Sequence, residues 1–334
     1  MAKWGISDRA AAVHEQALVW DNTFPFFAEA GAFSLHIAVL DRMRAAGYGC
    51  VTITTAADDD MPFTMRKLAH DRAIFGQHTD RFILIETVDD IFKARSEGRL
   101  GIVFSFQGTL PFERDIGLVE VYYQLGVRQA LMAYNQKNFV GDGCHEPGDG
   151  GLSRFGVSLV QEMNRVGMLV DCSHTGYRTT MDVFEVAKGP VIFSHSNARA
   201  LWDHERNIRD EQAKACARTG GVVGVNGDGV FVADNDPSTS ELFRHIDYFF
   251  NLIGPEHVGI GLDFVSDAPL LNTAARAKTG QWPKGQGYDM DVKWATPEQL
   301  PELTELMLKK GYSDEHVRGI LGGNWLRVAC DVWV

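Results

Sequence analysis

The chain alternates between short apolar runs and amphipathic segments, and this pattern constrains its fold more than any other feature. Nine apolar runs are candidate strands: Leu18–Asn22, Cys50–Thr55, Phe82–Val88, Gly101–Phe106, Gln129–Tyr134, Met168–Cys172, Pro190–Phe193, Val222–Val225 and Val258–Leu262. Helical periodicity marks segments between them: Leu35–Ala46, Val157–Val166, Thr179–Ala187 and Glu211–Thr219. Because the runs are apolar or β-branched nearly throughout, they indicate parallel strands that are buried on both faces of a sheet.

An alternation sustained over about 250 residues favours a TIM-type (β/α)8 barrel, an α/β fold, over an open doubly wound sheet. Nine runs compete for eight positions in the barrel, so we expect one of them, Phe82–Val88, to be accessory. No Gly-x-Gly-x-x-Gly motif follows the first run, which weakens a dinucleotide-binding hypothesis. No Pro/Ser-rich linker divides the chain, so the sequence predicts a single domain over residues 1–334.

Charge and cysteine usage narrow the class of protein. The net charge is −12, from 32 basic and 44 acidic side chains, and no cluster of basic residues occurs. This argues against nucleic acid or an anionic membrane as a partner. The five cysteines are scattered without a Cys-x-x-Cys pair, and no apolar stretch has the length of a signal peptide or a membrane span. We therefore expect a cytoplasmic protein with reduced thiols.

Two long loops stand out between the predicted elements. Gly141–Gly151 is rich in glycine and acidic residues, and Asn272–Asp289 is a long polar excursion. Long loops in a compact barrel are often binding loops or lids. The acidic residues of the first loop lack the spacing of an EF-hand, so we interpret it as a loop over the mouth of the barrel.

In a (β/α)8 barrel the active site lies at the carboxyl ends of the strands. Polar residues close seven of the runs: Asp21 and Thr23, Gln107, Tyr134, His174, His195, Asn226 and Asp263. His174 and His195 follow successive strands in matching contexts, Cys-Ser-His and Phe-Ser-His. A single histidine of this kind is more often structural than a ligand. Because neighbouring strands would bring both imidazoles to one small cation, however, the pair predicts a zinc-type metal site.

Three further residues have a functional and a structural interpretation. Asp263 could bind the metal or exchange a proton with an attacking water, or it could cap the following loop. Asp21 is either a metal ligand or a turn residue before Pro25. Arg206 could hold a substrate carboxylate through two parallel hydrogen bonds, or lie on the surface of a charged helix.

Longer motifs distributed over most of the chain carry a family resemblance. They are Gly126–Arg128, Gly151–Gly156, Glu162–Met168, Val170–His174, Pro190–Ala200, Arg206–Asp210, Gly220–Val222, Gly259–Phe264 and Leu321–Val328. Together they resemble the membrane (renal) dipeptidase family of zinc metallopeptidases, within the amidohydrolase-like barrels. The resemblance implies a (β/α)8 barrel, in agreement with the alternation of strands and helices.

The resemblance also implies roles for particular residues. The family has a two-zinc site made of a His-x-Asp on the first strand, a bridging glutamate and two later histidines. His174 and His195 match the two later histidines. Asp263 matches the aspartate that moves the proton of the attacking water, and Arg206, followed by Asn207, matches the arginine that holds the substrate carboxylate.

Three positions depart from the family pattern. The His-x-Asp reads Asp21-Asn22-Thr23, the bridging glutamate reads Gln107, and the histidine that polarises the substrate carbonyl reads Tyr134. Glutamine is neutral and binds a metal only through its carbonyl oxygen, so it is a poor bridge between two dications. We therefore expect at most one tightly bound zinc ion, held by His174 and His195 with help from Asp263, Asp21 or Gln107.

The first functional hypothesis is a metal-dependent hydrolase that cleaves a dipeptide or another small amide with a free carboxylate. In it, a metal activates water, Asp263 passes on its proton, Tyr134 hydrogen-bonds the developing oxyanion, and Arg206 and Asn207 bind the substrate. The alternative is a non-hydrolytic barrel, with one zinc ion or none, that binds a small carboxylate ligand. A third possibility keeps a metal and changes the reaction, for example to lyase-type chemistry. The joint retention of His174, His195, Asp263 and Arg206 favours the hydrolase; the family resemblance also leaves a homodimer open.

Overall fold

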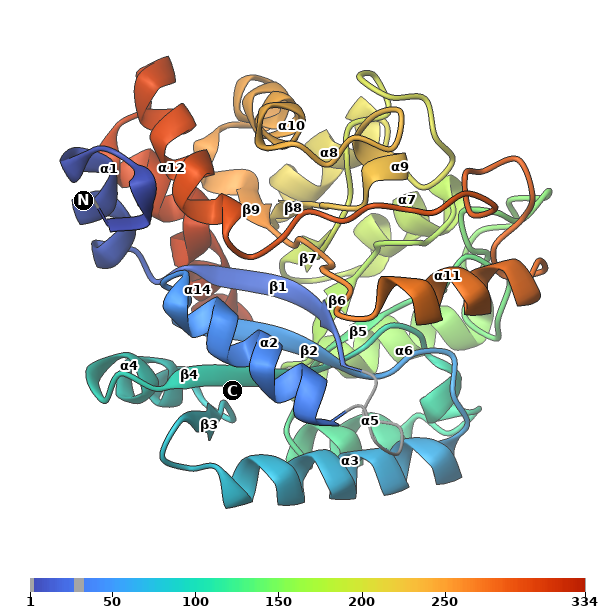
Figure 1. Ribbon diagram of the computed structural model, residues 1–334. Helices are drawn as coiled ribbons and strands as arrows, with labels where there is room; N and C mark the ends of the chain where they lie inside the picture. The colour runs from blue at the N-terminus through green and yellow to red at the C-terminus, as the bar shows by residue number, and fades with distance from the viewer. Residues whose placement is uncertain (1–2, 27–32, 334) are drawn as a thin grey trace.

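The computed structural model describes residues 3–26 and 33–333, which form one α/β barrel with helices around a ring of parallel strands (Figure 1). The strands are β1 (Trp20–Pro25), β2 (Cys50–Ala56), β3 (Phe82–Leu84), β4 (Leu100–Phe106), β5 (Val127–Leu131), β6 (Leu169–Asp171), β7 (Val191–Ile192), β8 (Val223–Val225) and β9 (Val258–Ile260). Every strand pair is parallel, and the strand order along the sheet is β7-β6-β5-β4-β2-β1-β9-β8.

The two ends of this sheet meet through a single parallel bridge between Phe193, just after β7, and Val223 in β8. The Phe193 amide donates to Val222 O at 3.0 Å, and the Gly224 amide donates to Phe193 O at 2.7 Å. Eight strands thus close into a barrel. The ninth, β3, pairs only with β4 and lies outside the ring, which confirms that the run beginning at Phe82 is accessory.

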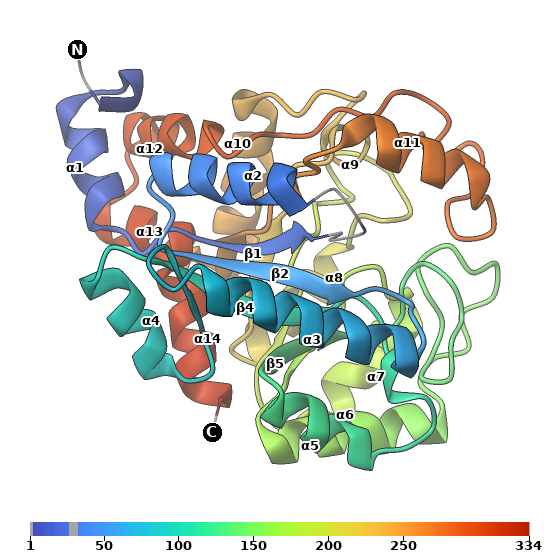
Figure 2. The same cartoon turned by 60° about the horizontal axis from the view of Figure 1, so that its bottom comes forward.

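Helices cover the outside of the barrel, and Figure 2 shows the same arrangement from a second direction. They are α1 (Asp8–Gln16), α2 (Phe33–Ala45), α3 (Met61–Gln77), α4 (Val88–Ser96), α5 (Gly117–Gln124), α6 (Arg154–Val166), α7 (Tyr177–Val186), α8 (Asp210–Arg218), α9 (Gly229–Val232), α10 (Thr239–Ile253), α11 (Ala268–Ala277), α12 (Gln299–Lys310), α13 (Asp314–Arg318) and α14 (Asn324–Val332). Short 3₁₀ turns at Lys3–Gly5, Leu110–Phe112 and Pro255–His257 and a π-helical turn at Gly319–Gly323 complete the described elements.

The predicted boundaries differ from the observed ones for local reasons. The helix expected from Val157 starts at Arg154, because the Ser153 side chain accepts a hydrogen bond from the Gly156 amide and caps the helix three residues earlier. The prediction that Asn272–Asp289 is entirely a polar loop is wrong. Its first residues belong to α11, which begins where Asp267 accepts a hydrogen bond from the Leu270 amide and which has a proline in its first turn.

α9 and the excursion that includes α11 share a small hydrophobic cluster. Val230, Phe231, Ala275, Tyr288 and Val292 are buried together there, apart from the main barrel core. In Figures 1 and 2, α11 lies at the right, the end toward which the arrows of β1 and β2 point, while α1 lies at the left. The excursion therefore lies at the carboxyl ends of the strands, where a barrel carries its active site.

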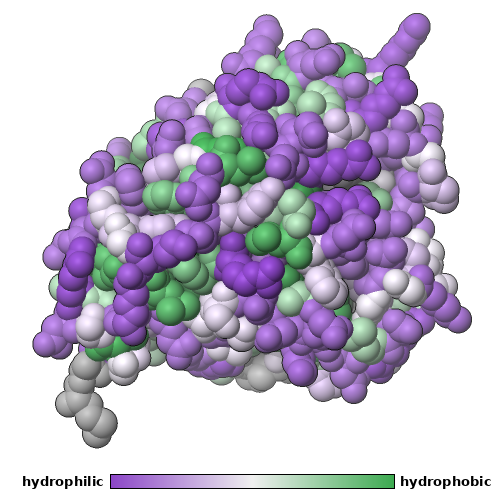
Figure 3. Space-filling view, turned by 90° about the horizontal axis from the view of Figure 1, so that it is seen from above, coloured by the Kyte–Doolittle hydropathy of each residue, from purple (hydrophilic) through white to green (hydrophobic). Residues whose placement is uncertain are grey.

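The face of the molecule in Figure 3 is mostly hydrophilic, with hydrophobic residues in separate patches. Among the described residues, no helix combines the length and the apolar character needed to cross a bilayer.

Closure of the barrel leaves room only for a glycine two residues before β8. A Cβ atom at Gly221 would lie 1.8 Å from Val191 O, across the seam between β7 and β8. We therefore expect Gly221→Ala to lower the free energy of unfolding by about 2–3 kcal/mol or more, because the backbone itself must shift. Urea titration measures this change. The matched control is Gly76→Ala in α3, where a Cβ meets nothing within 4 Å and stability should stay equal or rise; equal effects of both substitutions would contradict the argument.

Candidate active site

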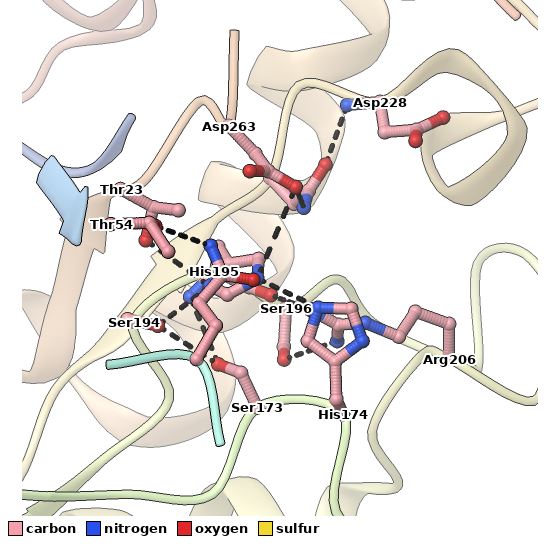
Figure 4. Close-up of polar contacts among 12 residues, drawn as sticks. Thr23, Thr54, Ser173, His174, Ser194, His195, Ser196, Arg206, Asp228 and Asp263 are labelled. Carbon is pink, nitrogen blue, oxygen red and sulfur yellow. Dashed lines mark hydrogen bonds and ion pairs between the residues drawn. The ribbon is translucent and has the colours of Figure 1, made fainter. Parts of the chain in front are cut away.

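Two imidazoles from neighbouring strands face each other at the mouth of the barrel. His174 follows β6 and His195 follows β7; their Nε2 atoms lie 3.0 Å apart and their ring centroids 5.0 Å apart (Figure 4). Both side chains are buried. The structure thus brings together the two histidines that the sequence placed at equivalent strand ends.

Hydrogen bonds to the other ring nitrogens determine the tautomers. His174 Nδ1 lies 2.7 Å from Asn135 Oδ1, and Asn135 Nδ2 donates to Gln281 O at 3.0 Å. The amide oxygen of Asn135 therefore faces the imidazole and can only accept. We assign the proton of His174 to Nδ1, which leaves a lone pair on Nε2.

The surroundings of His195 lead to the same assignment. Its Nδ1 lies 2.6 Å from Ser194 Oγ and 3.1 Å from Thr23 Oγ1. Both hydroxyls donate elsewhere, Ser194 to Asp171 Oδ2 and Thr23 to the Asn22 carbonyl oxygen, so both accept from Nδ1–H. A lone pair therefore remains on Nε2 of His195 as well.

Two lone pairs that face each other repel, and a cation bound by both nitrogens would remove this repulsion. Burial, and next the positive charge of Arg206, hold the pKa values of His174 and His195 well below the usual range, which disfavours a proton in that place. Two neutral imidazoles with converging Nε2 atoms are a donor set that zinc prefers. No third His, Cys, Asp or Glu of the described chain joins them in a group that could hold a metal ion. The residues thus fit a metal ion through two nitrogen donors.

Asp263 and Tyr134 flank the histidine pair. Asp263 Oδ2 lies 3.9 Å from His195 Nε2 and accepts a hydrogen bond from Asn226 Nδ2 at 3.4 Å (Figure 4). Burial raises the pKa of Asp263 to about 6, against the opposing effect of the Arg206 charge. The Tyr134 ring stacks on His174 with centroids 4.1 Å apart, and burial, followed by the charge of Asp263, raises the pKa of its hydroxyl. A phenol in this environment remains a hydrogen-bond donor.

Three residues around this centre have left-handed backbone conformations. The φ angles are 61° at Asn135, 60° at His174 and 56° at Asp263. Non-glycine residues adopt such angles at a cost, which proteins accept mainly where a side chain must be aimed at a functional site.

Arg206 is a buried cation beside the histidines, with an exposed fraction of 2%. Its guanidinium donates to Ser196 Oγ at 3.0 Å and to His195 O at 2.7 Å, while Nε has no partner. Within the described chain, Arg206 forms no ion pair with a carboxylate. Together with His174 and Asn207 it lines a cavity of about 200 Å³. A buried guanidinium without a counter-ion is suited to bind an anionic group of a ligand.

Polar atoms of three other predicted site residues make contacts within the protein; these residues are Asn207, Gln107 and Asp21. The Asn207 amide group donates to two backbone carbonyls, of Trp202 and Phe231, so only its unpartnered Oδ1 remains free, and that atom can accept but not donate. Gln107 donates to Thr54 Oγ1 at 2.8 Å. Asp21 accepts from the Leu262 amide at 2.8 Å and so links β1 to β9; burial raises its pKa to about 7. No hydrogen bond joins Asp21 or Gln107 to either imidazole in the described residues.

Sequence reasoning missed the side chains that orient the histidines, Asn135, Ser194 and Asp171. Asp171 accepts from the amides of Ser173 and Ser194 at 2.9 and 3.0 Å, and also from the Ser194 hydroxyl. It also missed Asp58, which follows β2 and has a buried Oδ1 without a hydrogen-bond partner. The rule of reading polar residues after each strand would have found Asp58.

His145 attaches the loop Gly141–Gly151 to two other loops at the mouth of the barrel. The buried imidazole contacts Glu205 Oε2 through Nδ1 and the Tyr288 hydroxyl through Nε2, each at 2.8 Å. Gly143 and Cys144 of this loop line the same cavity as Arg206. One histidine therefore joins three loops that follow different strands.

A closed parallel barrel with paired imidazoles and a buried arginine at its mouth defines an amidohydrolase-like protein. The sequence pattern of the membrane dipeptidase family (Peptidase family M19) matches residues 28–277, and the chain belongs to this family. Membership agrees with the resemblance carried by the sequence motifs.

Individual relatives agree with this assignment. Dipeptidase verJ of Clonostachys rogersoniana is 31% identical over 278 residues, 83% of this chain and 66% of the relative. Dipeptidase aclJ of Aspergillus oryzae is 34% identical over 71% of this chain and 53% of the relative, so the chain spans about half to two thirds of these relatives. The crystal structure of an amidohydrolase from Pseudomonas aeruginosa is 32% identical, covers 97% of this chain and 99% of its own, and has a TM-score of 0.88.

Stability in acid should depend on His204, whose Nδ1 accepts from the Arg206 amide at 3.0 Å and whose Nε2 lies 2.9 Å from Gln286 O. Burial is the main cause that lowers its pKa to about 4, so the unfolded chain binds the proton more tightly. The neutral His204 imidazole therefore contributes fully to the stability of the fold above pH 6.5, and this contribution disappears as the pH falls toward 4. When the pH falls from 7 to 5, the free energy of unfolding of the wild type decreases. We expect this decrease to be about 2 kcal/mol smaller in His204→Gln.

Urea titrations at the two pH values measure this difference. The surface substitution His70→Gln in α3 serves as control and should behave as the wild type does. An acid-induced loss that is the same in the wild type and in His204→Gln would contradict the role assigned to His204.

Proposed function

We propose that this chain is a zinc-dependent hydrolase that cleaves a dipeptide or a small amide with a free carboxylate. The observation that carries the proposal is the convergence of the Nε2 lone pairs of His174 and His195 beside the buried, unpaired cation of Arg206. A metal donor pair next to an anion-binding group is what hydrolysis of a carboxylate-bearing substrate requires. Membership of the membrane dipeptidase family supports the same reaction class.

We propose one zinc ion rather than two. His174 and His195 would hold it, with Asp263, Gln107 or Asp21 as further ligands. Gln107 is neutral, and one oxygen of Asp21 is occupied by backbone amides, so negative charge for a second dication is scarce. When bound there, zinc supplies a Lewis acid that polarises a carbonyl group and lowers the pKa of a water molecule.

The side chains around the pair have complementary roles in this proposal. Asp263, with a pKa of about 6, is charged near neutral pH and can take a proton from attacking water and pass it to the leaving amine. Tyr134 keeps its proton and donates a hydrogen bond to the oxyanion that develops on the carbonyl oxygen. Arg206 holds the substrate carboxylate and thereby orients the peptide bond.

Asp171 and Ser194 act indirectly, by positioning His195. The Asp171 carboxylate accepts a hydrogen bond from the Ser194 hydroxyl, which leaves the oxygen of that hydroxyl free to accept from His195 Nδ1. The imidazole is thereby kept in the tautomer that presents Nε2 to the metal.

For the location and the oligomeric state we keep the predictions made from the sequence and from the family resemblance. All five cysteines are free, which is consistent with a reducing cytoplasm, and we keep the prediction of a cytoplasmic enzyme with a small-molecule substrate. A homodimer remains a prediction of the family resemblance.

The metal site can be tested by composition and by turnover. Protein purified without chelator should contain about one zinc ion per chain by plasma mass spectrometry, and His174→Ala or His195→Ala should lose it. Turnover of a dipeptide panel, including peptides with a D-residue at the carboxyl end, should fall about 100-fold or more in His195→Ala and Asp263→Asn. Two ions at full occupancy would refute the single-metal site, and inactivity toward the whole panel would refute the hydrolase.

The proposed binding of the substrate carboxylate by Arg206 leads to a separate prediction. Arg206→Lys preserves the charge but removes the second hydrogen bond, so we expect kcat/KM for dipeptides to fall about tenfold to 100-fold. Dipeptide amides, which lack the carboxylate, should be poor substrates of the wild type and change little in the variant. Steady-state kinetics on both substrate types measures the effect; an equal loss on dipeptides and amides would instead indicate a damaged fold.

A further inference from the structure

A second and larger cavity opens at the mouth of the barrel, away from the Arg206 pocket. Its volume is about 950 Å³, and its walls come from the loops after β2, β4 and β5, from the start of α6 and from the turn after α11. Asp58, Arg114, Phe139, Arg154 and Gln281 are among its lining residues. Neither the histidine pair nor Arg206 borders this cavity.

Asp58 is the one acidic residue that lines this cavity. Its Oδ1 atom is buried, and the carboxyl group has no hydrogen-bond or ion-pair partner among the described residues. Gly108, directly after Gln107, leaves room for it, because a Cβ there would lie 2.4 Å from Asp58 Oδ1. A carboxyl group held beside a cavity without a partner is costly unless a ligand supplies a donor.

The rest of the lining indicates what surrounds a bound group. The Arg114 guanidinium lies over the Phe139 ring at 4.2 Å from its centroid, and neither Arg114 nor Arg154 forms an ion pair in the described chain. Phe155 adds a second aromatic side chain to the wall. This cavity therefore suits an apolar or acidic side chain.

Gln281 connects this cavity to the candidate reaction centre. Gln281, in the cavity wall, accepts the hydrogen bond from Asn135, whose oxygen contacts His174. Arg206, a cation for a carboxylate, and Asp58, a carboxyl group for a cation, thus line two cavities at the same mouth of the barrel, and a zwitterionic dipeptide presents the opposite charges.

We propose that Asp58 binds the free α-ammonium group of the substrate and that the cavity beside it receives the side chain of the amino-terminal residue. This inference rests on the proposed function, because it assumes a dipeptide with its carboxylate on Arg206. Asp58 then makes the enzyme selective for peptides with a free amino terminus over N-acylated ones. Recognition of both ends restricts the substrate to two residues.

The test measures binding rather than turnover. The probes are a phosphinate mimic of L-Ala-D-Ala and its N-acetylated form, titrated calorimetrically into the zinc-loaded full-length protein. We expect the free amine to bind the wild type at least about tenfold more tightly than the acetylated probe, since a hydrogen bond to a charged group contributes that much. In Asp58→Asn the free amine should lose this advantage, while affinity for the acetylated probe stays the same.

The control variant is Asp59→Asn, which changes the neighbouring carboxylate in the same loop. Asp59 accepts from the Ala57 amide at 2.9 Å, and asparagine retains an oxygen for that contact, so the preference for the free amine should persist. Equal affinity of the wild type for both probes, or an equal loss of both in Asp58→Asn, would overturn the inference and leave the proposed function intact. Absence of binding by either probe would overturn the proposed function itself, together with this inference.

Discussion

The site depends on a buried carboxylate that joins two strands of the barrel. Asp171, at the end of β6, accepts hydrogen bonds from backbone amides after β6 and after β7, and from the Ser194 hydroxyl. Burial raises the pKa of Asp171, whereas these hydrogen bonds act to lower it. The carboxylate therefore holds the strand ends in register and also determines the direction in which His195 presents its lone pair. Without it, the Ser194 hydroxyl that contacts His195 would lose its acceptor.

Much of this arrangement could be predicted from the sequence, since it follows from periodicity. Uniformly apolar runs indicated parallel strands, and the ends of parallel strands meet, so His174 and His195 were expected together. The orienting side chains could not be predicted, because the partner of a hydroxyl or an amide depends on which strands become neighbours across the closed ring. Asp58 could have been found, because it follows β2 as His174 follows β6, but two alanines separate it from the apolar run. The helix α11 was missed because the polar excursion was taken to begin at Asn272, whereas the helix and its cap, Asp267, begin before it.

The distribution of charge explains how one small site could recognise a zwitterion. Arg206 is buried without a carboxylate partner, and the buried Oδ1 of Asp58 lacks a partner in the neighbouring cavity. Each would be a liability in a hydrophobic core, because an uncompensated buried charge costs several kcal/mol, on the order of the stability of a domain. In a ligand-binding cleft, a ligand that carries both opposite charges removes this cost when it binds. Such a ligand therefore binds more tightly than one that lacks either charge.

His145 gives the mouth of the barrel a mechanical property. Because one imidazole contacts both Glu205 and Tyr288, none of the three loops can swing outward alone without breaking a hydrogen bond that also restrains another loop. The three loops would therefore have to open together, and the entry of substrate or the release of product would require that the contacts of His145 break first.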